Sequence, residues 1–241
     1  MNVRGLLIDI EGTTTPIAFV HETLFSYART HAREFLTKNS DNREVRADIE
    51  LLHEEHALDI RNKQQPPALD NNVESLSTYI EWLIARDRKS TGLKSLQGKI
   101  WKRGYSEGTL KSQVFPDVAA ALERWHAAGL SISIFSSGSV LAQQLLFAHT
   151  EAGNLTSFID HYFDTNVGKK GEADSYRRIG ATLQLDPSEI LFISDVVAEL
   201  EAAQEAGMKT VLSVRPGNAA QEWPQTIQSF AEVDYFLFIV K

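Results

Sequence analysis

Residues 6–15 read LLIDIEGTTT, an apolar run that ends in two carboxylates and a glycine. The run Leu6–Ile8 predicts a buried β-strand, and Asp9 follows directly after it. Because side chains alternate along a strand, Asp9 and Glu11 are expected to face one cavity at its carboxyl end. Gly12 permits a close turn of the backbone, and the threonines offer hydroxyl and N–H donors to an anion. A carboxylate nucleophile beside a second acid suits phosphoryl transfer through an aspartyl-phosphate.

The composition excludes several classes of protein. The chain has 241 residues, of which 43% are hydrophobic and 23% charged, as in an ordinary globular protein. It has no cysteine, which rules out disulfides and thiolate metal sites. A net charge of −8 argues against a nucleic-acid partner, and no apolar stretch approaches the roughly 20 residues that span a membrane. With a strand so near the first residue and no heptad pattern, we expect a cytoplasmic monomer.

Hydrophobic periodicity divides the chain into two kinds of structure. After Phe19 the apolar residues recur at helical spacing, with no convincing strand before Val114. Four helices are expected, over 19–35, 43–58, 71–88 and 92–105. From Val114 onward, strands and helices alternate. Strands are expected at 130–135, 161–164, 190–193, 210–214 and 235–240, and helices at 118–129, 140–149, 173–183 and 197–206.

This alternation predicts an α/β fold, a doubly wound and mostly parallel sheet with helices on both faces. The helical stretch is then an insertion after the first strand. We expect a catalytic α/β core over 1–17 and 113–241, and an all-helical cap over 18–112. The cap should close over the cavity and exclude water. It offers four aromatic side chains for an apolar part of a substrate, namely Tyr27, Trp82, Trp101 and Tyr105.

Polar residues follow three further predicted strands. Ser136 and Ser137 follow the strand at 130–135, where a hydroxyl pair can hold a phosphate. Lys170 lies in a loop before a helix and can place a charge on that phosphate. Asp195 follows the strand at 190–193 as a ligand for a hard cation, which Glu199 could support from the next helix. Singly these are a turn, a solvated lysine and a helix cap, but four strand ends together favour a phosphoryl-transfer site.

This order of motifs resembles the haloacid dehalogenase superfamily of aspartate-nucleophile phosphatases and, within it, the enolase-phosphatase family of methionine salvage. The motifs are DIEGTTTPI from Asp9, SSGS from Ser136, GKKGEADSYRRI from Gly168, Ser194-Asp195, and RPGN from Arg215. The resemblance runs essentially end to end. Most members of the superfamily have aspartate where this chain has Glu11, whereas glutamate there is typical of enolase-phosphatases.

The resemblance implies a Mg²⁺-dependent phosphoric monoester hydrolase, an acireductone synthase, with one Mg²⁺ per subunit. Its substrate would be 2,3-diketo-5-methylthiopentyl-1-phosphate, enolised and then dephosphorylated to 1,2-dihydroxy-3-keto-5-methylthiopentene. The implied catalytic residues are Asp9, Glu11 and Lys170; the implied metal ligands are Asp9, Glu11 and Asp195; and the implied phosphate contacts are Ser136, Ser137 and Lys170.

Two alternatives stay open at this point. A phosphatase of other small sugar or polyol phosphates would share the same catalytic set and differ in the cap. A catalytically silent module that binds metal or phosphate would be favoured by loss of Asp9 or Lys170, and both are present.

Overall fold

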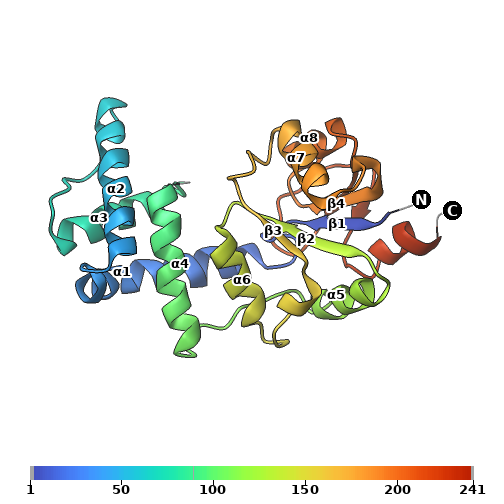
Figure 1. Cartoon of the computed structure of the whole chain (residues 1–241), viewed down its shortest axis with the longest axis horizontal. Coiled ribbons are helices and arrows are strands. Elements are labelled where there is room, and N and C mark those ends of the chain that lie inside the picture. The colour runs from blue at the N-terminus through green and yellow to red at the C-terminus, as the bar shows by residue number, and fades with distance from the viewer. Residues whose placement is uncertain (1–2, 89, 240–241) are drawn as a thin grey trace. The chain divides into compact units, whose positions relative to one another are not determined.

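The computed structural model describes residues 3–88 and 90–239 and divides into two compact units (Figure 1). The first comprises Met1–Val20 with Lys111–Lys241, and the second comprises His21–Leu110. We call them the α/β unit and the helical unit. The expected insertion, 18–112, thus corresponds to a unit over 21–110. Within the described residues, no helix combines the length and the apolar character that crossing a bilayer requires.

A parallel sheet forms the centre of the α/β unit, with strand order β3-β2-β1-β4-β5-β6. Its strands are β1 (Gly5–Ile8), β2 (Ser131–Phe135), β3 (His161–Phe163), β4 (Ile190–Ser194), β5 (Lys209–Ser213) and β6 (Thr226–Ile227). Every pair of neighbours is parallel. The chain runs from β1 outward to β3 and then returns to the other side of β1 as β4. A topological switch point, where such sheets bind ligands, therefore lies between β1 and β4.

Burial on both faces explains why β1 reads as a continuous apolar run. Leu6, Leu7 and Ile8 are fully buried, as central strands of a parallel sheet should be. Helices α7 (Ala173–Leu183) and α8 (Val197–Glu205) lie on one side of the strands, and α5 (Val118–Ala127) and α6 (Val140–Ala148) on the other (Figure 1). Leu7 packs into one apolar cluster with residues of α7 and α8. The doubly wound α/β fold is confirmed.

The prediction of a last strand at 235–240 is wrong. Tyr235–Ile239 forms a π-helical turn, and Val240 lies outside the described residues. A short apolar run does not distinguish strand from helix by periodicity. In addition, the place next to β5 is taken by β6, through pairing of Leu212 with Thr226. With two residues, β6 is too short to leave a pattern in the sequence.

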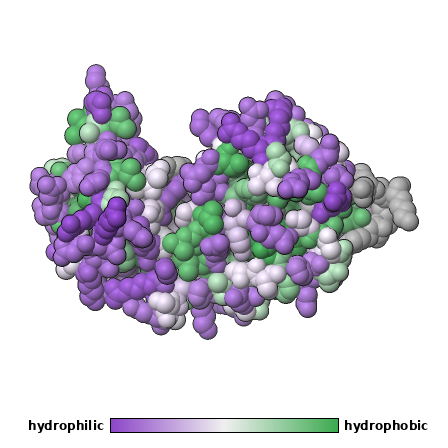
Figure 2. Space-filling model, in the orientation of Figure 1, coloured by the Kyte–Doolittle hydropathy of each residue, from purple (hydrophilic) through white to green (hydrophobic). Residues whose placement is uncertain are grey.

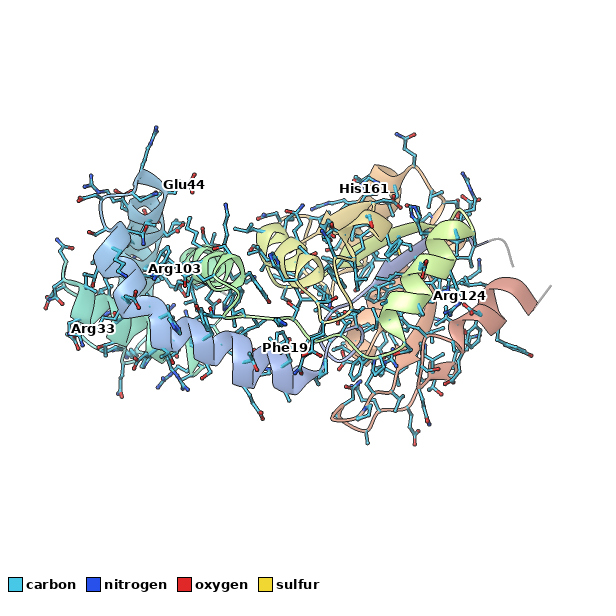
Figure 3. All side chains as sticks on the ribbon, turned by 90° about the horizontal axis from the view of Figure 1, so that it is seen from below. Phe19, Arg33, Glu44, Arg103, Arg124 and His161 are labelled. Carbon is cyan, nitrogen blue, oxygen red and sulfur yellow. The ribbon has the colours of Figure 1, made fainter. Side chains whose placement is uncertain are left out.

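Four helices build the helical unit, in the segments predicted for them. A π-helical segment over Phe19–Phe25 leads into α1 (Ser26–Asn39), followed by α2 (Arg43–Arg61), α3 (Val73–Ile84) and α4 (Thr91–Ser106). Side-chain oxygens of Asn42, Asn72 and Ser90 cap the first turns of the last three helices. Hydrophilic side chains cover most of the face of this unit that Figure 2 shows. Charged side chains come from several of its helices, for example Arg33 of α1, Glu44 of α2 and Arg103 of α4 (Figure 3).

The helical unit also contains buried ion pairs. Lys99 Nζ lies 2.5 Å from Asp48 Oδ2, between α4 and α2. Asp59 Oδ1 accepts a hydrogen bond from Arg88 (2.8 Å), and its Oδ2 accepts one from the Tyr79 hydroxyl (2.8 Å). These carboxylates are satisfied by direct partners.

Candidate active site

The ends of β1 and β4 bring together residues that are far apart in the sequence. The Asp9 N–H continues the sheet by donating to the Ile193 carbonyl (2.9 Å). The Asp9 carboxylate is almost completely buried and lies 2.7 Å from Lys170 Nζ. Its Oδ1 also accepts the Ile10 N–H (2.7 Å). The predicted nucleophile and the predicted lysine therefore form a buried ion pair at the switch point of the sheet.

Glu199 completes this pair from the first turn of α8. Its Oε2 lies 2.6 Å from Lys170 Nζ and accepts the Ser194 hydroxyl at 2.9 Å. The sequence suggested that Glu199 supports Asp195; the structure instead pairs it with Lys170. This partner was missed because the sequence argument compared only residues close along the chain, whereas Lys170 lies in a different loop, before α7. Two carboxylates therefore contact the lysine, Asp9 after β1 and Glu199 from α8, which follows the neighbouring strand β4.

Asp195 follows β4 and lies against the loop of residues 9–15, which we call the nucleophile loop after its predicted nucleophile, Asp9. The Asp195 carboxylate is against Gly12, because a Cβ added to Gly12 would come within 2.2 Å of Asp195 Oδ2. Gly12 also has φ +70°, which side chains rarely adopt. Only glycine fits this position. Burial, together with the negative charge of Asp9, raises the pKa of Asp195 to about 7.

The site holds more negative than positive charge. Burial, with Asp9 nearby, also raises the pKa of Glu199. For Lys170, burial alone would lower the pKa, but Asp9 and Glu199 outweigh it and the pKa is raised. Asp9, Asp195 and Glu199 thus surround a single lysine, and Asp195 forms no ion pair within the described residues.

This donor set fits a hard cation by its chemistry, since buried carboxylate oxygens in excess of their cations suit Mg²⁺ or Ca²⁺. Asp9 and Asp195 are the two carboxylates available for it. No group of three or more His, Cys, Asp or Glu residues in metal-binding arrangement occurs among the described residues, so backbone oxygens or water must complete a coordination shell.

The argument that placed Glu11 beside Asp9 does not apply as stated. The strand ends at Ile8, and the N–H groups of residues 13–15 all turn back to the Ile10 carbonyl (3.2, 2.9 and 2.9 Å). Glu11 itself forms an isolated bridge with Thr15. Strand alternation therefore does not extend to Glu11. Its predicted roles as metal ligand and catalytic residue stay predictions.

The serines after β2 form a compact turn. Ser136 N–H donates to the Phe163 carbonyl of β3 (3.1 Å), and Ser136 Oγ accepts the Gly138 N–H (3.2 Å). Ser139 Oγ caps α6 through the Ala142 N–H (3.3 Å). The turn and the helix cap are thus real features of this loop. Ser136 and Ser137 are half-buried, and their contact with a substrate phosphate stays a prediction.

Sequence reasoning missed the residues that hold Lys170. The Tyr176 hydroxyl donates to the Lys170 carbonyl (2.7 Å), and Ser175 Oγ donates to the Lys169 carbonyl (2.7 Å). Both come from the first turn of α7, where helical periodicity explains them as packing residues. Lys170 Nζ also lies 5.8 Å from the centre of the Phe135 ring.

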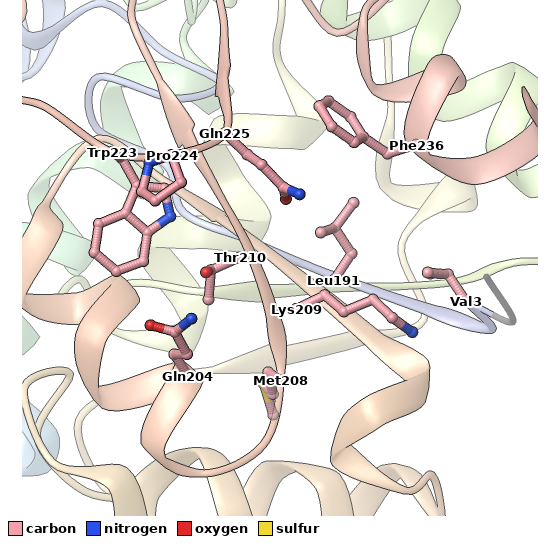
Figure 4. A pocket seen from close by; sticks show the side chains of 10 residues that line it. All are labelled: Val3, Leu191, Gln204, Met208, Lys209, Thr210, Trp223, Pro224, Gln225 and Phe236. Carbon is pink, nitrogen blue, oxygen red and sulfur yellow. The ribbon is translucent and has the colours of Figure 1, made fainter. Parts of the chain in front are cut away.

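A cavity of about 290 Å³ lies away from this site (Figure 4). It is lined by Val3, Leu191, Gln204, Met208, Lys209, Thr210, Trp223, Pro224, Gln225 and Phe236. Leu191 and Thr210 belong to the beginnings of β4 and β5, whereas the predicted site residues follow the ends of strands.

Comparisons with known proteins agree on one family. A model of haloacid dehalogenase-like hydrolases matches residues 3–207. The Enolase-phosphatase E1 of Synechococcus elongatus is 52% identical over 236 residues, which cover 97% of this chain and 98% of that protein. The Enolase-phosphatase E1 of Drosophila melanogaster is 43% identical over 218 residues, covering 90% of this chain and 85% of that protein.

Solved structures extend the same result to the fold. The UTR4 protein of Saccharomyces cerevisiae has a TM-score of 0.77 and 35% identity, covering 95% of this chain and 98% of that one. CbbY of Rhodobacter sphaeroides, at 19% identity, has a TM-score of 0.60 with coverage of 96% of each chain and shares the fold.

Proposed function

Because the chain belongs to the haloacid dehalogenase-like hydrolases and, within them, to the enolase-phosphatase E1 family, we propose that it is the enolase-phosphatase of methionine salvage. It converts 2,3-diketo-5-methylthiopentyl-1-phosphate to 1,2-dihydroxy-3-keto-5-methylthiopentene and phosphate. In a chain of this family, the observation that carries the proposal is the buried pair of Asp9 and Lys170, 2.7 Å apart at the switch point of the sheet.

In the phosphatase half-reaction, we assign Asp9 as the nucleophile. Its carboxylate attacks phosphorus, the bond to the substrate oxygen breaks, and the phosphoryl group is held as an aspartyl-phosphate until water releases it. Lys170 balances the charge that spreads over the transferred group, and Glu199 holds the lysine in place. Ser136 and Ser137 would donate to the phosphate oxygens from the end of β2.

We propose Mg²⁺, one per chain, held by Asp9 and Asp195 and by a backbone or side-chain oxygen of Glu11. When bound, this ion screens the repulsion between the anionic carboxylate and the anionic phosphate. The excess of buried carboxylates over Lys170 supports this assignment.

Enolisation needs a base that removes a proton from the carbon next to a carbonyl. Glu11 is our candidate, since the resemblance to enolase-phosphatases rests in part on this glutamate and its side chain is half-buried. A Glu11→Asp variant tests this assignment through the rate of enol formation, which should fall because the shorter side chain withdraws the carboxylate.

The test of the function uses the purified chain with the diketo phosphate, with and without Mg²⁺. Enol absorbance and free phosphate are followed together. Both signals should appear, and both should require Mg²⁺. A panel of sugar phosphates is the control. Phosphate release from the diketo substrate no faster than from the panel would contradict the substrate assignment.

A further inference from the structure

The RPGN motif, whose role the sequence leaves open, forms a turn at the end of β5. Asn218 N–H donates to the Arg215 carbonyl (3.1 Å), and Gly217 has φ +92°. Proline in the second position and glycine in the third are typical of a type II turn. Such a turn brings the side chains of its first and fourth residues, Arg215 and Asn218, close together. We call residues 215–221 the brace segment.

Two side chains of the brace segment bind neighbouring carbonyls of the nucleophile loop. Asn218 Nδ2 donates to the Gly12 carbonyl (2.9 Å) and to the Ser213 carbonyl (3.0 Å). Arg215 Nε donates to the Thr13 carbonyl (3.3 Å). Gly12 and Thr13 are the third and fourth residues after Asp9, in the part of the loop where the chain turns back on itself.

Arg215 is itself held by several groups, although its buried Nη2 has no hydrogen-bond partner among the described residues. It is buried, pairs with Asp117 (3.0 Å), and donates to the Gln228 carbonyl (2.8 Å). Its guanidinium lies 4.7 Å from the ring centres of both Phe115 and Phe230. A planar, always charged group suits such a position, since it can bond in its plane and stack on its faces.

A third side chain binds the loop of Asp195. Gln221 Nε2 donates to the Asp195 carbonyl (2.8 Å), and Gln221 Oε1 accepts the Val197 N–H (3.1 Å). The brace segment therefore holds the backbone on both sides of the switch point, at Gly12 and Thr13 on one side and at Asp195 on the other.

The brace segment contacts the two loops that carry the buried carboxylates Asp9 and Asp195. Asp9 and Asp195 are both buried carboxylates and repel one another in a site that holds one lysine. The hydrogen bonds from Asn218, Arg215 and Gln221 tie the backbone of both loops to the brace segment. The Asn218 side chain also reaches the contact itself, because a Cβ on Gly12 would lie 3.0 Å from Asn218 Oδ1 and 2.2 Å from Asp195 Oδ2. Asn218 Oδ1 is buried and has no hydrogen-bond partner among the described residues.

We propose that the brace segment fixes the spacing of Asp9 and Asp195, and that Asn218 and Gln221 are positioning residues for the cation and for phosphoryl transfer. The catalytic part of this inference rests on the proposed function. The structural part does not, since it concerns the two loops in the absence of substrate.

The experiment compares Asn218→Ala, Gln221→Met and the double variant with the wild-type chain. Asn154→Ala and Arg124→Gln are matched controls. Asn154 forms hydrogen bonds only within its own turn, and Arg124 (Figure 3) pairs with Asp234. Neither residue lies in a predicted site loop.

An Arg215 variant is less informative, because it leaves Asp117 without its buried partner and lowers overall stability.

Three measurements separate positioning from stability. The first is Mg²⁺ affinity of the cation-free chain by calorimetry, which should weaken about 10- to 100-fold in the brace variants. The second is amide exchange, which should accelerate over residues 12–15 and 195–197. The third is turnover, where kcat should fall and KM should stay nearly constant. The controls should change none of these, even where their melting temperatures fall equally.

Unchanged Mg²⁺ affinity and unchanged exchange in the double variant would overturn the proposal and leave the segment a purely structural one. A failure of the proposed function looks different. In that case the wild-type chain would not act on the diketo phosphate, while affinity and exchange would still respond to Asn218→Ala.

Discussion

Both units of this chain bury ionised side chains, and they do so in different ways. In the helical unit, Asp59 has Arg88 on one carboxylate oxygen and the Tyr79 hydroxyl on the other, and Asp48 pairs with Lys99. In the α/β unit, Asp9 and Glu199 share Lys170, and the neighbouring Asp195 has no ion pair within the described residues. Arg88 also pairs with Glu55 (3.0 Å), so each of these carboxylates in the helical unit has a cationic partner, whereas in the α/β unit Asp195 has none among the described residues.

The comparison shows that a buried ion pair does not identify a functional site. In both units the contacts are short and the carboxylates Asp9, Asp48 and Asp59 are deeply buried, so neither distance nor burial of the carboxylate separates them. A carboxylate without a cationic partner, Asp195, and the topology of the sheet do separate them. The pairs of the helical unit join α2 to α4 and to the segment that follows α3, whereas the unpaired carboxylate of the α/β unit lies where the order of strands reverses. An unbalanced buried cluster needs a cation or a substrate to offset it.

The largest expected difference between the units comes from removing a carboxylate charge. Asp9→Asn should lower phosphate release by about 10⁴-fold or more, because the amide is not a nucleophile. Asp48→Asn should leave kcat unchanged and lower only the melting temperature. Phosphate release and thermal unfolding of both variants measure this. Turnover in Asp9→Asn at the wild-type rate would exclude Asp9 as the nucleophile.

Removing the lysines gives the next largest difference. Lys170→Met should reduce kcat by about 10²- to 10³-fold, since the charge on the transferred group loses its counterion. Lys99→Met should cost about 3–5 kcal/mol of unfolding free energy, because Asp48 is left buried and unpaired. Urea unfolding and steady-state kinetics compare the two. Equal losses of activity in both variants would show that charge balance does not distinguish the units.

Adding a Cβ atom at a glycine in each unit tests the same contrast through steric effects. Gly12→Ala should reduce kcat by about 10²-fold, because its Cβ displaces the Asp195 carboxylate. Gly92→Ala should cost about 1–3 kcal/mol of stability with kcat retained, since its Cβ would meet the Asp48 carbonyl at 2.8 Å. Kinetics and melting curves report both effects. A Gly12→Ala enzyme with normal kcat would mean that the contact with Asp195 has no part in the reaction.

The last expected effect involves no loss of activity and concerns stability as a function of pH in the cation-free chain. The pKa of Asp195 is about 7 in the folded chain, against an ordinary value of 3.8. Between these values the unfolded chain binds fewer protons than the folded one, so stability falls as pH rises from about 4 to about 7. The raised pKa of Glu199 acts in the same direction. Asp195→Asn should flatten part of this slope, measured by urea unfolding; a slope identical to wild type would contradict the assignment.

Much of the α/β fold could be predicted from the sequence because periodicity records burial. Leu6–Ile8 is apolar throughout since β1 is buried on both faces, and helix α5 ends just before Gly129, which has φ +77°. The prediction of a strand over 235–240 failed because apolar content alone does not show whether a neighbouring strand is available for pairing. The order of strands is not local information either, and it decides which loops meet.

The site was predictable only as a set of strand ends. Asp9 and Lys170 were expected in one place, and the structure puts them 2.7 Å apart. The ion pair of Lys170 with Glu199 and the hydrogen bond from Asn218 to the Gly12 carbonyl could not be predicted, since both join segments that are distant in the sequence. Hydrogen bonds to backbone carbonyls leave no pattern of residue types, because any residue supplies the carbonyl.

The central claim, that the unbalanced cluster of the α/β unit makes Asp9 a nucleophile, is tested most directly by trapping the phosphorylated enzyme. The chain is mixed with the diketo phosphate and Mg²⁺, quenched in acid and treated with borohydride, which reduces an acyl phosphate to an alcohol. Mass spectrometry of the peptide containing residue 9 should then find homoserine in place of Asp9, and only when Mg²⁺ is present. Phosphate release at full rate without homoserine at residue 9, or with the modification at another carboxylate, would contradict the account.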